Sequence, residues 1–382
     1  MIYLDNAATT WPKPKTVVEA MKQCVEEYGA NPGRGNHRLS RIAGEKVEKT
    51  RYDLAQLFQI PDPNNLFFCV NGTLGINLGL KGVLRPGDHV IATRWEHNAV
   101  ARPLESLKEE KQIQVSYLSV GREGEMDLHE LEKCIRRETR LMIVTHGSNV
   151  TGTVLPIQSI SRVLHRHGVW LMVDAAQTAG ILDLNVQEMG IDILVAPGHK
   201  GLLGPQGTGF LYVHPDIPIQ PVIQGGTGIR SESLEQDAER PYGFESGTLN
   251  TPGIAGLGAG IRFLNETGLE KIYSKEMALT KKIEEGLREI RGVILYTPNQ
   301  LKLPVISFEM ENLDSIQGAT LLDQHYQICV RGGFHCAALA HQENGTASSG
   351  TIRISPGYFN TEQDAEVFLQ AVAEISTAFV SG

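Results

Sequence analysis

The chain has 382 residues, 41% of them apolar and 21% charged, which is typical of a soluble globular protein with room for two domains. A formal net charge of −9 argues against a nucleic-acid or acidic-membrane partner, and no apolar run approaches the roughly 20 residues of a membrane span. Five dispersed cysteines without CxxC spacing indicate neither a disulfide framework nor a metal site. Because no secretory signal is visible either, we expect a cytoplasmic protein.

Strands and helices alternate through the first two thirds of the chain. Helical patterns over Lys15–Tyr28 and Leu39–Gln59 come first, and others lie between the strands, over Asn71–Leu84, Leu128–Arg136 and Ile157–His167. The predicted strands are Leu66–Val70, His89–Thr93, Gln114–Leu118, Leu141–Thr145, Val169–Val173, Ile193–Ala196 and Gly209–Val213. This alternation predicts an α/β fold with a mostly parallel sheet covered on both faces.

The pattern changes after Pro252. Two long helices, Ile254–Asn265 and Leu269–Ile290, are followed by short strands and a closing helix. These are Val293–Tyr296, Val305–Glu309, Ile328–Arg331, Thr351–Ile354 and the helix Glu362–Phe379. The order predicts a smaller α+β domain. The glycine-rich and then charged segment Gly225–Arg240 is typical either of a mobile active-site loop or of a solvated linker.

A lysine that follows the sixth predicted strand is the strongest functional signal. The apolar run Ile193–Ala196 leads through Pro197 and Gly198 to His199 and Lys200, and a glycine-rich turn follows. Burial disfavours the charged form of a lysine and lowers its pKa. Such a lysine is a poor structural residue and a good imine-forming nucleophile. An isolated His-Lys pair is more typical of a surface turn, so the neighbouring motifs decide between the two interpretations.

An aspartate at the end of the preceding strand supplies the second signal. Asp174 follows Val169–Val173, and Gln177 stands three residues later. Ligands of open α/β sheets bind at the carboxyl ends of strands, although Asp174 alone would be typical of a helix N-cap. Pyridoxal 5'-phosphate (PLP) needs a lysine for its Schiff base and an acidic partner for its pyridinium nitrogen. Asp174 and Lys200 together therefore favour a PLP enzyme.

A strand-to-helix turn could hold the phosphate of such a cofactor. The strand Leu66–Val70 runs into a helical pattern at Gly72 and Thr73. Free N–H groups and the positive helix end make this kind of turn an anion site, and the Thr73 hydroxyl adds a donor. The turn is not a Walker loop, because it lacks the glycine spacing and the Gly-Lys-Ser/Thr ending. Many such turns bind nothing, so this signal is weak alone.

These motifs, in this order, resemble the class V branch of the fold-type I PLP enzymes, specifically the cysteine desulfurases and the similar selenocysteine lyases. The resemblance covers nearly the whole chain. Its motifs are YLDNAATT (3–10), NPGRGNHRLS (31–40), NGTLGINL (71–78), WEHNA (95–99), HGSNVTGT (146–153), VDAAQ (173–177), GHKGLLGPQGTG (198–209), FESGTLNTPG (244–253), VRGGFHCA (330–337) and GTIRISPGYFNT (350–361). It implies a large PLP-binding domain with a mostly parallel seven-stranded sheet, residues 15–252. The N-terminal arm 1–14 and residues 253–382 would form the small domain.

The resemblance implies roles for four residues around the cofactor ring. Lys200 would form the Schiff base and later move the substrate's α-proton. Asp174 would pair with the pyridine nitrogen, and Gln177 would hydrogen-bond the phenolic oxygen of the ring. His97 would stack on the ring and is counted with Lys200 and Cys336 among the catalytic residues.

Five more residues would complete the cofactor site. Asn149 would lie near the ring oxygen and the substrate carboxylate, and Gly72, Thr73 and His199 would hold the phosphate. Thr248 would reach the phosphate of a neighbouring subunit, which implies an obligate homodimer with two composite sites.

Two residues near the C-terminus would act on the substrate. By resemblance Arg353 clamps the α-carboxylate, for which a guanidinium is suited because it gives two parallel hydrogen bonds. Cys336 lies in a glycine-rich, partly basic segment with Arg331 and His335, and such surroundings lower the pKa of a thiol. Cys329, in an apolar run, has the pattern of a buried structural cysteine.

The reaction that the resemblance implies is conversion of L-cysteine to L-alanine. Sulfur would pass to Cys336 as a persulfide and then to an acceptor protein or a reductant, as in iron–sulfur cluster assembly. The short interval between Cys336 and Arg353 predicts a compact, rigid loop like that of the group II branch. Segment 341–350 departs from the usual sequence of that group, which leaves the acceptor open. Two alternatives also stay open: a selenocysteine lyase or another class V lyase or epimerase, and a non-catalytic PLP-binding scaffold for sulfur transfer.

Two positions depart from the pattern of the related desulfurases. Pro197 stands where relatives often carry a phosphate-binding serine, and it has neither a hydroxyl nor an N–H donor. Leu74 stands where many carry another hydroxyl. We therefore expect one phosphate contact to be lost, or replaced by Thr73 or water, and the phosphate affinity to be lower.

Overall fold

A seven-stranded sheet forms the centre of the larger lobe in the computed structural model, which describes residues 1–33, 35–300 and 302–380. Its strands lie in the order β2-β8-β7-β6-β5-β3-β4. They are β2 Leu66–Cys69, β3 His89–Thr93, β4 Gln114–Leu118, β5 Thr139–Thr145, β6 Trp170–Asp174, β7 Ile193–Pro197 and β8 Gly209–Val213. β8 is antiparallel to β2 and β7, and the remaining neighbours are parallel. The predicted mostly parallel sheet is confirmed.

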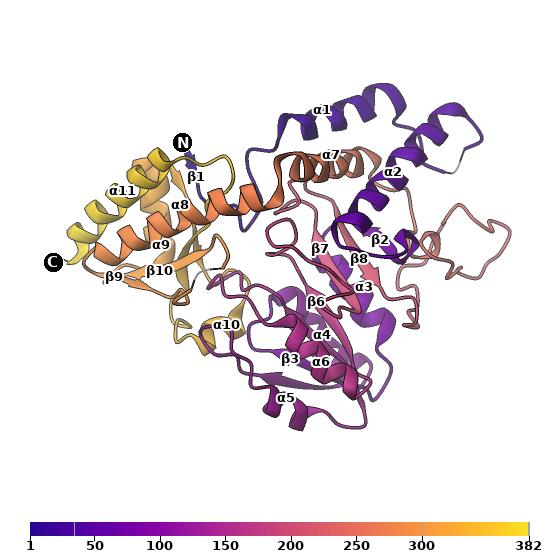
Figure 1. Cartoon of the computed structure of the whole chain (residues 1–382), viewed down its shortest axis with the longest axis horizontal. Coiled ribbons are helices and arrows are strands. Elements are labelled where there is room, and N and C mark those ends of the chain that lie inside the picture. Colours follow the sequence, from indigo (N-terminus) through magenta and orange to yellow (C-terminus); the bar gives the residue numbers. More distant parts are fainter. Residues whose placement is uncertain (34, 301, 381–382) are drawn as a thin grey trace.

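Helices surround this sheet, and Figure 1 shows α1, α2 and α7 together at one end of the larger lobe. The helices of this part of the chain are α1 Lys15–Gln23, α2 Arg38–Leu57, α3 Gly72–Val83, α4 Asn98–Glu110, α5 Leu128–Cys134, α6 Ile157–Arg166 and α7 Thr251–Thr267. Short helical turns are Cys24–Tyr28, Pro63–Asn65 and Tyr242–Phe244. The predicted helix Lys15–Tyr28 therefore ends in a wider π-turn over its last five residues.

The smaller lobe has its own sheet, in the antiparallel order β12-β13-β10-β9. Its elements are α8 Leu269–Glu289, β9 Val293–Leu295, β10 Ile306–Met310, α9 Ser315–Tyr326, β11 Ile328–Cys329, β12 Arg331–Gly333, α10 Ala338–Glu343, β13 Thr351–Ile354 and α11 Glu362–Val380. The first strand of the chain, β1 Ile2–Tyr3, pairs with β11, so both chain ends lie in this lobe (Figure 1). The prediction of a single strand over Ile328–Arg331 is wrong, because this stretch contains parts of two strands, β11 and β12, that belong to different sheets.

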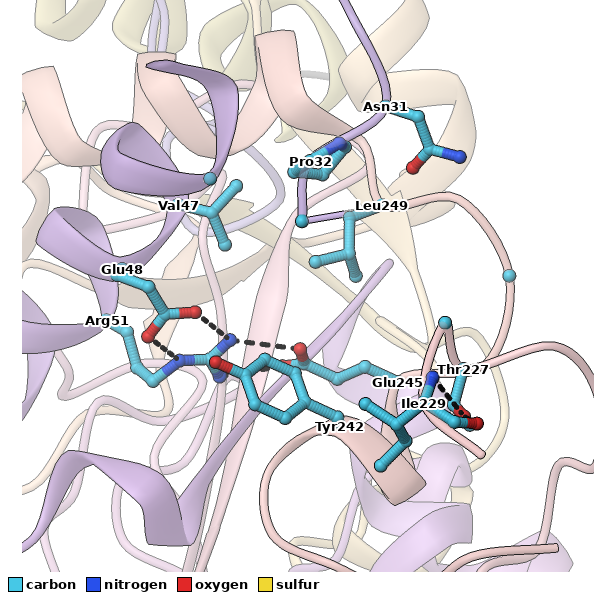
Figure 2. A pocket seen from close by; sticks show the side chains of 14 residues that line it. Asn31, Pro32, Val47, Glu48, Arg51, Thr227, Ile229, Tyr242, Glu245 and Leu249 are labelled. Atoms are coloured by element: carbon cyan, nitrogen blue, oxygen red, sulfur yellow. Dashed lines mark hydrogen bonds and ion pairs between the residues drawn. The ribbon is translucent and has the colours of Figure 1, made fainter. Parts of the chain in front are cut away.

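An ion pair fastens α2 to the edge of the large sheet, as Figure 2 shows. The Arg51 guanidinium is fully buried and donates to both carboxylate oxygens of Glu245, at 2.7 and 2.9 Å. Glu245 also accepts from the N–H of Phe68 in β2, and Arg51 donates to the carbonyl of Leu66. Because Glu245 begins the segment that carries Thr248, the pair fixes the start of that segment beside β2.

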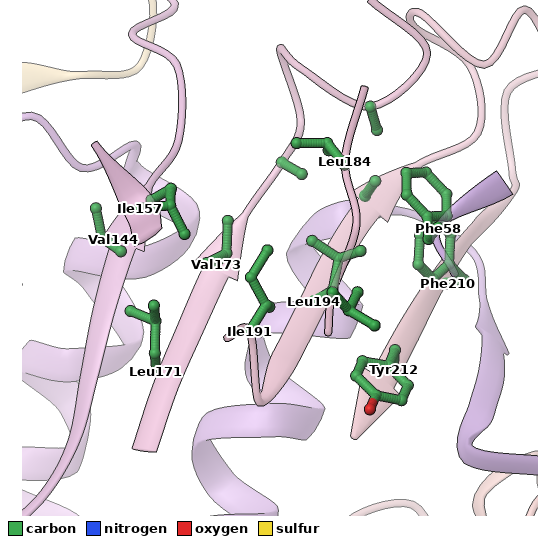
Figure 3. Packing of buried hydrophobic residues seen from close by; sticks show 14 of the residues in the cluster. Phe58, Val144, Ile157, Leu171, Val173, Leu184, Ile191, Leu194, Phe210 and Tyr212 are labelled. Atoms are coloured by element: carbon green, nitrogen blue, oxygen red, sulfur yellow. The ribbon is translucent and has the colours of Figure 1, made fainter. Parts of the chain in front are cut away.

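The two faces of the sheet are packed by two different apolar clusters. Side chains alternate along a strand, so Leu194 lies in one cluster while Ile193 and Val195 lie in the other. Figure 3 shows Leu194 on the same side as Val173 of β6. Burial on both faces explains why these strands read as continuous apolar runs.

The apolar clusters also show where α7 packs. Ile254 and Leu257 of this helix belong to the cluster of the large sheet, whereas Ile283 of α8 belongs to the cluster of the small lobe.

The division of the chain at residue 252 remains a prediction. The structure forms neither helix nor strand over residues 225–240, and whether that loop moves remains a prediction too. No helix in the described residues combines the length and apolar character needed to cross a membrane.

The ion pair yields a stability prediction. We expect Glu245→Gln to lower the free energy of unfolding by about 3–5 kcal/mol, because it removes the buried counter-charge of Arg51 and leaves only the exposed Glu48. The matched control is Glu48→Gln, since Glu48 also bonds Arg51 but is 45% exposed. Its cost should be about 0–1 kcal/mol. Urea unfolding followed by circular dichroism measures both, and equal costs would contradict the prediction.

Candidate active site

One cavity of about 210 Å³ collects most of the predicted site residues. It lies where β6 and β7 end and where the arm before α1 passes the sheet. The predicted residues that line it are Gly72, Thr73, His97, Asn149, Asp174, Gln177, His199, Lys200 and Arg353. Ala7, Ala8, Pro197, Arg331 and His335 also line it. Thr248 and Cys336 lie outside this lining.

Lys200 enters the cavity three residues after β7 ends. Burial, opposed by the nearby Asp174 carboxylate, lowers the pKa of Lys200 to about 8. About one tenth of its amine is therefore neutral at pH 7, far more than for an ordinary lysine. Lys200 is half-buried, and its role as the imine-forming nucleophile remains a prediction.

Asp174 is the last residue of β6 and is only 4% exposed. Burial raises its pKa, while a hydrogen bond from the Ala176 N–H, at 2.9 Å, and the Lys200 charge act in the opposite direction. A buried carboxylate in this position gains from any positive charge placed in the cavity. It is suited to hold a protonated ring nitrogen.

Two histidines of the cavity are neutral at pH 7. Burial and the charges of Lys200 and nearby arginines lower the pKa of His97 to about 4, and burial with the charges of Lys200 and Lys13 does the same for His199. His97 is the N-cap of α4, where its Nδ1 accepts from the Ala99 N–H at 3.0 Å. The proton of the neutral ring is therefore on Nε2. Nδ1 of His199 is buried without a hydrogen-bond partner in the described residues.

The turn before α3 has the geometry of an anion site. Asn71 caps the helix by accepting from the Leu74 N–H at 2.8 Å, and Gly72 and Thr73 have no intrahelical acceptor for their own N–H groups. A Cβ added to Gly72 would lie 3.3 Å from Cδ of Pro197, so the glycine permits the close approach of α3 to the end of β7. Whether Pro197 weakens phosphate binding remains a prediction.

The two amide side chains of the cavity are partly engaged by backbone carbonyls. Gln177 Nε2 donates to the Ala7 carbonyl at 3.0 Å, and Asn149 Nδ2 donates to the His335 carbonyl at 2.7 Å. Their roles toward a ring oxygen or a carboxylate remain predictions. The structure adds a role that the sequence did not suggest, because Asn149 connects the cavity to the loop of Cys336.

Arg353 on β13 is buried and faces the same cavity. Its Nη1 donates to the Asn149 carbonyl at 3.0 Å, and its Nη2 donates to Asp5 Oδ1 at 2.8 Å. The Nε atom is buried without a partner among the described residues. Sequence reasoning missed Asp5, although it lies within the motif at residues 3–10.

Cys336 is exposed and has a left-handed backbone conformation with φ of 59°. Its carbonyl accepts from the Asn98 N–H at 2.7 Å, and Nη2 of Arg331 lies 3.4 Å from its Sγ. The expectation that His335 also supplies positive charge is wrong, because burial lowers the pKa of that ring to about 2. His335 instead contacts the Thr351 hydroxyl at 3.0 Å and helps to hold the loop.

Two further predictions concern residues away from the cavity. The prediction that Cys329 is a buried structural cysteine is wrong, since its side chain is partly exposed and its Sγ lies 3.9 Å from Asp323 Oδ1. Thr248 Oγ1 accepts from Asn31 Nδ2 at 3.4 Å. Asn31 and Leu249 line a second cavity of about 300 Å³, visible in Figure 2, against α2. Within one chain Thr248 therefore stays outside the Lys200 cavity, and its reach into a second subunit remains a prediction.

Comparison with known proteins identifies the family. The Aminotransferase class-V profile matches residues 2–368. A probable cysteine desulfurase of Methanothermobacter thermautotrophicus is 35% identical over 98% of this chain and 94% of its own length. The apo structure of a cysteine desulfurase from Thermococcus onnurineus NA1 superposes with a TM-score of 0.92 at 34% identity, covering 99% of this chain and 95% of that one.

The chain belongs to the cysteine desulfurase family. A Salmonella agona protein named cysteine desulfurase is also similar, at 33% identity over 98% of this chain and 93% of its own. The family, the fold type and the enzyme class predicted from the sequence are confirmed.

The environment of Lys200 yields a pH prediction. After hydroxylamine has removed any bound aldehyde, we expect reductive methylation of Lys200 to rise with pH and to be half-maximal near pH 8, where burial places its pKa. Asp174→Asn should move this midpoint downward, because the Asp174 carboxylate raises the pKa of Lys200. Mass spectrometry of the Lys200 peptide measures both midpoints. A midpoint near the ordinary lysine value of about 10.4 would contradict the prediction.

Proposed function

We propose that this protein is a PLP-dependent cysteine desulfurase that converts L-cysteine to L-alanine and passes the sulfur to Cys336 as a persulfide. The observation that carries the proposal is that half-buried Lys200 and buried Asp174 share one cavity, while the exposed Cys336 thiol lies 3.4 Å from Arg331, which lines the same cavity. A cysteine lyase without sulfur transfer would need no such thiol.

The residues of the cavity fit PLP. Asp174 offers a buried carboxylate to the ring nitrogen, and His97 offers a neutral ring. Gly72 and Thr73 offer N–H groups of the first helical turn to the phosphate, and His199, whose Nδ1 has no partner among the described residues, lines the same cavity. When bound, PLP stabilises the negative charge that develops on the substrate α-carbon.

Lys200 and Arg353 would act on the two ends of the amino acid. Arg353 holds the α-carboxylate through a guanidinium that Asp5 and the Asn149 carbonyl already orient. The Lys200 amine takes the α-proton and returns it to product, which its lowered pKa permits near neutral pH.

Cys336 would take the sulfur. Its thiolate forms a bond to the substrate sulfur as the substrate Cβ–S bond breaks, and the β-carbon receives a proton. The products are L-alanine and a Cys336 persulfide, so the atoms and charge balance. Arg331 at 3.4 Å stabilises the negative sulfur, and exposure lets an acceptor protein or a thiol reductant remove the outer atom.

The oligomeric state, the location and the acceptor are also proposed. A homodimer is proposed because Thr248 lies outside the cavity of its own chain, on a segment that Glu245 fixes. A cytoplasmic location is proposed from five dispersed cysteines, all of them free in the structure. The acceptor protein and a place in iron–sulfur cluster assembly are proposed from the family alone.

Substitution of Cys336 tests the proposal. We expect Cys336→Ala to abolish alanine formation from L-cysteine in the presence of a thiol reductant, while selenide release from L-selenocysteine is largely retained. Cys329→Ala is the matched control, because the Cys329 Sγ lies near Asp323, which does not line the cavity, whereas the Cys336 Sγ lies near Arg331, which does. Equal loss with both substrates would contradict the sulfur-transfer role, and a wild-type protein that forms no alanine would favour a non-catalytic scaffold.

Two substitutions of His97 separate its role as the N-cap of α4 from the proposed role of its aromatic ring in binding PLP. We expect His97→Asn to keep the acceptor for the Ala99 N–H and the unfolding free energy, but to weaken PLP binding up to about tenfold through loss of the aromatic face. His97→Phe should keep PLP affinity and lose about 1 kcal/mol of stability with the cap. Absorbance titration with PLP and urea unfolding measure the two effects. The reverse pattern would contradict the assigned roles.

A further inference from the structure

The chain segment before α1 forms hydrogen bonds to the loop that carries Lys200. Lys13 Nζ donates to the His199 carbonyl at 2.7 Å and contacts the Thr10 hydroxyl at 2.5 Å. The same carbonyl accepts from the Thr10 N–H at 3.1 Å and from the Thr9 hydroxyl at 3.2 Å. One peptide oxygen next to Lys200 thus receives donors from three residues about 190 positions away in sequence.

The carbonyl of Lys200 itself is held in a similar way. It accepts from the Leu203 N–H at 2.8 Å within the loop, and the Thr10 hydroxyl lies 3.2 Å away. The peptide groups on both sides of the Lys200 Cα are therefore tied to the segment 9–13. Because the loop continues through Gly201 and Gly204, and glycine backbones are conformationally permissive, these external contacts add to the restraint from bonds within the loop, such as Gly204 N–H to the Gly198 carbonyl at 2.8 Å.

Lys13 is a costly residue for a purely structural contact. Burial lowers its pKa to about 8, and its partners at hydrogen-bond distance are neutral oxygens. Side chains of similar length without charge would avoid this cost. An ammonium group is nevertheless suited to the place, because it can donate to a carbonyl and a hydroxyl at once.

The same segment also contacts the other end of the site. Asp5 binds Arg353 at 2.8 Å, and the Ala7 carbonyl accepts from Gln177. The nine residues from Asp5 to Lys13 thus connect the proposed carboxylate-binding arginine to the loop of the reactive amine. Loss of the Lys13 contact would therefore loosen the loop of Lys200 and leave the contacts of Arg353 in place.

We propose that Lys13 is a positioning residue, which anchors the segment 9–13 to the His199 carbonyl and so fixes the direction from which the Lys200 amine meets the substrate. The inference rests on the proposed function. Orientation of a reacting group contributes to the rate of the chemical step and little to substrate binding. Lys13 therefore acts on kcat through Lys200 and leaves the contacts of Arg353 in place.

Two variants test this role in the full-length protein. Lys13→Met keeps the length of the side chain and removes the donor, and Lys15→Met changes an exposed lysine two residues away. We expect Lys13→Met to lower kcat for alanine formation about tenfold and to change KM for L-cysteine less than about twofold. Lys13→Arg, which keeps a charged donor, should recover most of the loss, and Lys15→Met should match the wild type.

Hydrogen exchange gives a readout that does not depend on turnover. We expect the amides of residues 198–204 to exchange about tenfold faster in Lys13→Met than in the wild type or in Lys15→Met. Faster exchange with unchanged kcat, or a lower kcat with unchanged exchange, would overturn the proposal. If the wild type formed no alanine, the proposed desulfurase function would fail, while unchanged exchange would by itself still refute the anchoring by Lys13.

Discussion

The site depends on the burial of one amine at the carboxyl edge of a parallel sheet. Lys200 is half-buried near Asp174, and two effects on its pKa oppose each other, because burial lowers it while the carboxylate raises it. A lysine kept charged by a closer ion pair would be inert, and one without a neighbouring carboxylate would be more costly to protonate. Adjacent strands supply this balance, since Asp174 of β6 pairs with Val195 of β7, five residues before Lys200.

Around that amine, segments distant in the sequence are brought together by backbone contacts. Asn149 donates to the carbonyl before Cys336, Asn98 donates to the carbonyl of Cys336, and the N-terminal segment binds the loop of Lys200. The thiol and the amine thus stand on loops whose peptide groups are fixed from outside, while the guanidinium stands on strand β13. Rigid support of this kind lets side chains on loops keep a reactive arrangement.

The sequence predicted the sheet and most of the cavity because both have local signals. Continuous apolar runs mark strands buried on two faces, and Asp174, Gly72 and Lys200 follow such runs directly. It did not predict the contacts of Asp5 or Lys13, because a polar residue in an N-terminal segment carries no mark of a partner far along the chain. The local sequence also did not predict that His335 is neutral, since its lowered pKa follows from burial of the ring and from the charges of Arg353 and Arg331.

The charge around the cavity differs from that of the chain as a whole. The protein carries a formal net charge of −9, yet Lys200, Arg331 and Arg353 all line one small opening. An acidic surface with a positive interior focuses its field at that opening, so that a negatively charged molecule is repelled at long range and attracted only near the mouth. Anionic compounds should therefore enter faster as added salt screens the outer surface, up to the ionic strength at which the inner attraction is screened as well.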